Sequence, residues 1–197
     1  MERPGAWHHV TVRGNERRAI YRDDPRDRRS DSPLYRFTSN QLYSIGFGGV
    51  ALGIARGTMD AFLALPQEKT RRGAGKPMVE NNVVQSHVAQ SEARWRSARY
   101  FLHAAADEAL ETIEERGEMD MDQRTRLRLA STWAIQSSRE IVNTLFHDCG
   151  SMAVFEENPF ERRLRDIHTV AQQGQGRILH YETVGQVMLG LTPENIY

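Results

Sequence analysis

Residues 32–62 read SPLYRFTSNQLYSIGFGGVALGIARGTMDAF. Apolar side chains recur through this stretch at helical intervals, at Leu42, Ile45, Val50, Ile54 and Phe62. Glycines and alanines fill the positions between them, although each glycine disfavours a helix by ~1 kcal/mol relative to alanine. We therefore predict a helix over residues 39–65 that lies very close against a second helix. Arg56 and Asp60 interrupt the apolar run, which disfavours a membrane-spanning interpretation.

Further helices are predicted downstream from their start and stop signals. Pro66 and the run TRRGAGKP at 70–77 end the first helix. The predicted helices are 79–116, ending before Gly117; from Asp120 or Asp122 to Cys149, ending before Gly150; from Pro159 to Gln173; and 178–189. No segment alternates long enough for a core strand. The sequence therefore predicts an all-α fold, an antiparallel bundle of four to five helices.

The composition is that of an ordinary globular protein, with 39% hydrophobic and 26% charged residues in 197 and no net charge. Nothing in this balance indicates a nucleic-acid or anionic-membrane partner. Cys149 is the only cysteine and cannot form an internal disulfide. The first residues lack the apolar core of a signal peptide, so we expect a cytoplasmic protein.

Residues 1–31 differ from the rest and are predicted to be an appendage. Arginines and aspartates dominate them, which favours disorder or at most a marginal hairpin turning at Gly14 and Asn15. The string WHHVTVRGNERRAIYRDDPRDR at 7–28 resembles the opening strands of single-tyrosine transposases of the repetitive-element type, and the resemblance ends by about Arg29. A remnant or mis-joined reading frame is the main interpretation, and a DNA-binding arm the alternative.

Residues 32–197 resemble another family in three stretches. The quoted segment at 32–62 is similar to the first helix of the type-2 acyl-CoA dehydrogenase C-terminal domain. RRGAGKPMVENNVVQSHVAQSEARWRSAR at 71–99 is similar to the second, and ENPFERRLRDIHTV at 157–170 to the start of the active-site helix. Acyl-CoA dehydrogenases and two-component flavin hydroxylases share this domain, so the resemblance implies FAD as the cofactor.

The resemblance also implies which residues would meet the cofactor. Arg71 stands where the family has an arginine on the flavin pyrophosphate across a subunit interface, and Lys76 and the downstream Gln85 accompany it. Planar guanidinium groups suit phosphate oxygens. Gly150 and Ser151 match a small-residue turn against the cofactor of a neighbouring subunit. The alternative for Arg71 and Lys76 is a solvated basic loop. The alternative for Gly150 is a glycine that ends a helix.

The resemblance also implies positions for the catalytic residues, and this sequence lacks the expected residue at each of them. The dehydrogenase glutamate would fall at Gly174, and the histidine of the hydroxylases would fall at Gln173, which cannot act as a base near neutral pH. His168, on the same helix, is a usable acid or base or a structural histidine. No carboxylate lies between Asp166 and Glu182, and no histidine pair has metal-chelating spacing.

These residues predict the C-terminal domain of a flavin-dependent oxidoreductase, acting by family on CH–CH donors. It would supply the core of a homodimer or homotetramer and part of the FAD site, beside an acyl-CoA or aromatic substrate in the full-length relative. Relatives of this kind are about twice as long, and their missing domains hold most of the flavin ring, so we expect this chain to be inactive alone. The alternative is a helical oligomerisation module without chemistry.

Overall fold

The computed structural model describes residues 31–65 and 75–193, and its elements in those ranges are all helical. The long helices are α1 (Ser39–Leu63), α2 (Asn82–Arg116), α3 (Met121–Cys149), α4 (Phe160–Gln172) and α5 (Leu179–Met188). Short 3-10 helices adjoin them: η2 (Pro33–Arg36), η3 (Met78–Glu80), η4 (Gly150–Val154) and η5 (Gly174–Gly176). The predicted all-α class is confirmed.

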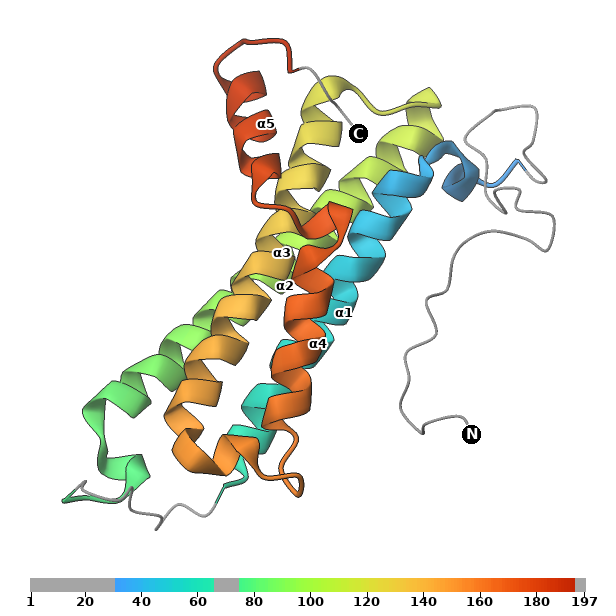
Figure 1. The fold of residues 1–197 in the computed structure, drawn as a ribbon. Coiled ribbons are helices and arrows are strands. Elements are labelled where there is room, and N and C mark those ends of the chain that lie inside the picture. Colours follow the sequence, from blue (N-terminus) through green and yellow to red (C-terminus); the bar gives the residue numbers. More distant parts are fainter. Residues whose placement is uncertain (1–30, 66–74, 194–197) are drawn as a thin grey trace.

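Successive helices α1 to α4 run in opposite directions along one bundle (Figure 1). α3 is the central element, because it packs against α1, α2, α4 and α5. α5 instead leaves the end of the bundle and rests mainly on α3. One core cluster joins α1, α3 and α4, around Ile141 and Phe160, and a second joins α2 to the first half of α3, around Leu102 and Leu127.

The helix boundaries follow from local capping chemistry. The Thr38 side chain accepts a hydrogen bond from the Gln41 backbone N–H, and the Gln41 side chain accepts one from the Thr38 backbone N–H. This pair fixes the start of α1. Asp120 caps α3, as predicted, and Gly117 ends α2 at φ 87°. α2 begins slightly later than predicted because the Asn81 side chain accepts from two backbone N–H groups there.

The glycines of α1 only partly serve the close packing that the sequence predicts. A methyl group on Gly48 would lie 2.9 Å from Leu102 Cδ2, so α1 and α2 do approach closely at that point. Gly46, Gly49 and Gly53 have no described atom within 4 Å of that position. They lie on the outer face of α1, which points away from the core. The prediction of close packing therefore holds at Gly48 and is wrong, within the described chain, for the other three.

Candidate functional site

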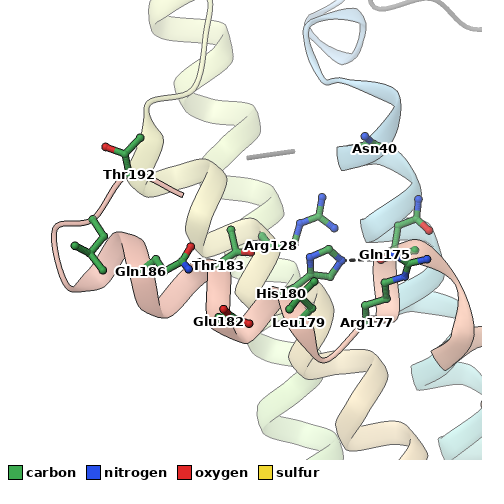
Figure 2. A pocket seen from close by; sticks show the side chains of 12 residues that line it. Asn40, Arg128, Gln175, Arg177, Leu179, His180, Glu182, Thr183, Gln186 and Thr192 are labelled. Atoms are coloured by element: carbon green, nitrogen blue, oxygen red, sulfur yellow. Dashed lines mark hydrogen bonds between the residues drawn. The ribbon is translucent and has the colours of Figure 1, made fainter. Parts of the chain in front are cut away.

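A cavity of about 730 Å³ opens where α5 leaves the bundle (Figure 2). Its walls come from the start of α1, the first half of α3, the connection around η5, and α5. The lining residues are Asn40, Arg128, Gly174, Gln175, Arg177, Leu179, His180, Glu182, Thr183, Gln186, Leu191 and Thr192. The volume falls within the range of small-molecule sites, roughly 300–1,000 Å³.

Arg128 is a buried cation in the wall of this cavity. Only 7% of its surface is exposed, although it carries a full positive charge. Its Nη1 donates to Ser44 Oγ at 2.9 Å, and Ser44 Oγ in turn donates to the Asn40 carbonyl at 2.7 Å. This hydrogen bond links the guanidinium of Arg128, on α3, to α1 near the start of that helix.

His180 fixes the connection between α4 and α5. Its Nε2 lies 2.6 Å from the Gly174 carbonyl, which can only accept, so this ring nitrogen donates. Burial lowers the pKa of His180, the bond to Gly174 opposes that effect, and the positive charges of Arg128 and Arg177 lower the pKa further. The imidazole is therefore neutral at neutral pH.

A second anchor holds the same connection from α3. The Gln136 amide nitrogen donates to the Gly176 carbonyl. A methyl group on Gly176 would lie 3.0 Å from the Ala171 carbonyl oxygen and 3.1 Å from Ile135 Cγ2, so only glycine fits without movement. The start of η5 is thus held from α5, and its end is held from α3.

Of the two predicted catalytic residues, one lies beside this cavity and the other does not line it. Gly174, at the position of the dehydrogenase glutamate, lines it, and Gln173 is half-buried directly beside it. His168 is exposed on α4 and its Nε2 lies 2.9 Å from Asn143 Oδ1. His168 is not among the residues that line the cavity, so its geometry favours the structural alternative.

The predicted cofactor-binding residues lie at the other end of the bundle. Lys76, Gln85, Gly150 and Ser151 are all exposed there, and Arg71 lies outside the described residues. The Gln85 amide donates to the Val79 carbonyl at 2.7 Å. About 14 residues of α3 separate the level of Gln136 from Gly150, which is roughly 21 Å at ~1.5 Å per residue. The two groups of predicted residues are thus far apart on one chain.

Gly150 has a backbone role of its own. Its φ of 61° and ψ of −142° fall in a region that only glycine adopts readily, directly after the last residue of α3. This geometry ends the helix and turns the chain into η4. The helix-ending alternative for Gly150 therefore holds, and a cofactor role would come in addition to it.

Two other classes of feature are missing from the parts of the chain that the structure describes. No three His, Cys, Asp or Glu residues gather there as they would around a metal ion. None of the described helices combines the length and the apolar character that crossing a bilayer requires.

The sequence did not point to Arg128, Arg177 or Asn40 as site residues. One signal was present: Arg128 is a lone cation inside the run LRLASTWAI, whose other members are mostly apolar or small. An arginine at such a position is rare unless it is paired or faces a cavity. The contact of His180 with Gly174 depends on the connection between α4 and α5 and has no sequence motif.

Comparison with known proteins identifies two kinds of enzyme among the relatives of this chain. An indole-3-acetate monooxygenase of Pseudomonas putida is 26% identical over 163 residues, which are 83% of this chain and 42% of that protein. A 3-sulfinopropanoyl-CoA desulfinase of Variovorax paradoxus is 30% identical over 154 residues, 77% of this chain and 35% of that enzyme. The chain thus spans less than half the length of either relative.

The fold agrees with these relatives. XiaF from Streptomyces sp., solved in complex with FADH2 and glycerol, superposes with a TM-score of 0.76 at 17% identity, over 83% of this chain and 42% of that one. The helical bundle therefore has the same fold as the matching part of that protein.

Residues 45–174 match the model of the acyl-CoA dehydrogenase C-terminal domain, and the chain belongs to that family. The predicted family is confirmed. These matches lend no support to the transposase-like interpretation of residues 1–29, which lie outside the described residues.

Proposed function

We propose that this bundle is the C-terminal part of an FAD-dependent oxidoreductase of the monooxygenase kind, acting in the cytoplasm on an aromatic substrate. The observation that carries the proposal is the connection at 173–177, held by Gln136 and His180 beside the cavity. Relatives of this chain include an indole-3-acetate monooxygenase. A bound reduced flavin would supply the electrons for oxygen insertion, and this connection would position the substrate.

The residues around the cavity favour an oxygenase over an acyl-CoA dehydrogenase. Dehydrogenation needs a positioned base to remove the α-proton, commonly a carboxylate. Gly174 offers none, and Glu182 is exposed on α5, away from that connection in Figure 2. His180 is close, but its Nε2 proton is committed to the Gly174 carbonyl. An acyl-CoA substrate is accordingly the second choice.

The proposed FAD site is shared between copies of the chain. Lys76, Gln85 and the turn at Gly150 and Ser151 would contact the phosphate end of a flavin whose ring lies beside the 173–177 connection of another copy. The separation of roughly 21 Å along α3 supports this division. The exposed outer face of α1, formed by Gly46, Gly49 and Gly53, offers a surface on which another helix can approach closely. We therefore propose a homodimer or homotetramer.

Flavin titration tests the proposed site. We expect the chain to bind FAD weakly, and FAD better than riboflavin, because the proposed contacts are to the phosphate end. Lys76→Gln and Ser151→Ala should each weaken FAD binding severalfold without changing riboflavin binding. Arg116→Gln removes an exposed cation at the opposite end of α2 and serves as the matched control. Equal affinity for FAD and riboflavin, or equal effects of Lys76→Gln and Arg116→Gln, contradicts the proposal.

The second candidate is a helical oligomerisation module without chemistry. The exposed glycine face of α1 favours it, because the open space beside these glycines would let another helix approach closely. An oligomer that binds neither FAD nor riboflavin would establish this function in place of the first.

A further inference from the structure

A histidine and a buried carboxylate join α2 to the end of α3. His87 Nδ1 lies 2.7 Å from Asp148 Oδ2, and the two residues are 61 positions apart in the sequence. A carboxylate accepts hydrogen bonds, so Nδ1 carries the proton of this contact. The side chain of Asp148 is 4% exposed and that of His87 is 33% exposed, so the pair runs from the interior of the bundle to its surface.

The pair connects the two segments that hold the proposed contacts to the FAD phosphates. Asp148 lies two positions before the turn at 150–151, and His87 lies in the second turn of α2, two positions after Gln85. α2 also packs against η3, which begins two positions after Lys76. Figure 1 shows the start of α2 and the end of α3 at the same end of the bundle.

An aspartate at this place costs stability for two reasons. Asp148 is in the last turn of α3, where the partial negative charge of the helix end disfavours a carboxylate. It is also buried, and the free energy of removing a charge from water is only partly returned by hydrogen bonds. Apolar side chains of similar volume in place of a buried pair are often neutral or stabilising. Stability alone therefore does not account for the pair.

The pair adds direction to the apolar packing around it. The start of α2 and the segment after α3 already share one core cluster, which includes Val84 on α2 and Ala153 on η4. Apolar contacts are non-directional, whereas a hydrogen bond requires a given distance and angle. The bond between His87 and Asp148 therefore fixes how the end of α3 lies along α2, and with it the place of the turn at 150–151.

We propose that the His87–Asp148 pair positions the turn at 150–151 relative to Lys76 and Gln85, so that both segments meet one pyrophosphate group. The pair acts through these residues and does not itself contact the cofactor. This inference rests on the proposed FAD site and names the pair that sets the geometry of its phosphate end.

Variants at His87 separate direction from stability. His87→Leu keeps a side chain of similar size but removes the donor. His87→Asn places an amide nitrogen where the ring has Nδ1, so it restores the donor. Ile113→Val removes one carbon from the other core cluster, near the far end of α2, and controls for a loss of stability alone. If His87→Leu does not fold, His87→Ala carries the same comparison, because alanine suits a helix and needs no added space.

Hydrogen exchange of the full chain without flavin measures the turn directly. We expect the backbone amides of residues 150–154 to exchange roughly tenfold faster in His87→Leu, because a contact that keeps this segment closed is lost. The rate should return to that of the unmodified chain in His87→Asn, and Ile113→Val should not change it. An unchanged rate in His87→Leu overturns the proposal.

Titration of the same variants with FAD and with riboflavin measures the consequence for binding. His87→Leu should weaken FAD binding roughly tenfold, as the loss of a supporting hydrogen bond does at metal sites. Riboflavin binding should stay the same, and His87→Asn should restore FAD binding. These results, together with the change in exchange, support the proposal.

Two results overturn this inference and leave the proposed FAD site standing. One is an FAD affinity that His87→Leu does not change in a chain that prefers FAD to riboflavin. The other is an equal loss of FAD affinity in His87→Leu and Ile113→Val. An unmodified chain without any preference for FAD over riboflavin instead contradicts the proposed FAD site itself, and the positioning role is overturned with it.

Discussion

Several hydroxyl groups of α3 are buried without a described hydrogen-bond partner. Thr132 is fully buried, and its Oγ1 finds no partner within the described chain. Thr58 is equally buried, but its Oγ1 donates to the Ile54 carbonyl at 2.8 Å. Leaving a buried polar group unpaired costs roughly 1–3 kcal/mol, so replacing it with a methyl group of the same shape removes that cost.

Thr132→Val should therefore leave the free energy of unfolding unchanged or raise it by about 1 kcal/mol. Thr58→Val is the matched comparison and should lower it, because the Ile54 contact is lost. Urea titration of both variants measures the difference. Thr132→Val destabilising the chain as much as Thr58→Val would show that the Thr132 hydroxyl has a partner.

His180 makes stability depend on pH. Burial lowers its pKa in the folded chain below the unfolded value of about 6.5. As the pH falls through the interval between these two values, the unfolded chain binds a proton that the folded chain does not, so the free energy of unfolding falls. His180→Gln can still donate to Gly174 but does not titrate. We expect the free energy of unfolding of this variant to change less between pH 7 and pH 5 than that of the unmodified chain, as measured by urea titration. An unchanged slope contradicts the assignment.

At the scale of the element, the η5 connection depends on how closely it packs against α3 and α4. Gly176→Ala would place a methyl group 3.0 Å from backbone, which cannot move as a side chain can. We expect a loss of about 1–3 kcal/mol, as for other overpacked sites. Gly174→Ala meets no described atom within 4 Å and should cost less than 1 kcal/mol. Thermal unfolding of the pair checks this, and equal losses would contradict it.

The helices were predictable because each is encoded locally. The caps at Thr38, Asn81 and Asp120 and the stop at Gly117 lie within a few residues of the boundaries they set. The family resemblance placed Gln173 and Gly174 near the site in the same way, from a short motif.

The cavity was not predictable, because it joins distant parts of the chain. Ser44 and Arg128 are 84 positions apart, and Gln136 and Gly176 are 40 apart. Nothing near either residue reveals the other. The direction in which α5 leaves the bundle also depends on the tertiary packing of η5, and that direction creates the cavity.

At the scale of the whole molecule, we expect association through the outer face of α1. Light scattering at micromolar concentration should give a multiple of 22.5 kDa. Gly49→Gln puts a long side chain on that face and should weaken association at least tenfold. Thr169→Gln places the same side chain on exposed α4 and should not. A mass near 22.5 kDa for the unmodified chain contradicts this expectation.

The chain alone should show no acyl-CoA dehydrogenase activity, with or without added FAD. A positioned base contributes roughly 10²–10⁴-fold, and neither Gly174 nor Gln173 supplies one. An electron-acceptor dye assay with short, medium and long acyl-CoA substrates measures this. Steady FAD-dependent turnover that disappears in His168→Ala would show that His168 is the base despite its exposed position.

The way α5 attaches has a consequence for how the molecule fluctuates. α5 rests mainly on α3, while α1, α2 and α4 share the two core clusters. Segments with few buried apolar contacts open at a lower free energy than the core does. α5 can therefore detach and return as a unit while the other four helices stay folded. Each such opening removes one wall of the cavity, so a ligand can enter and leave without unfolding the bundle.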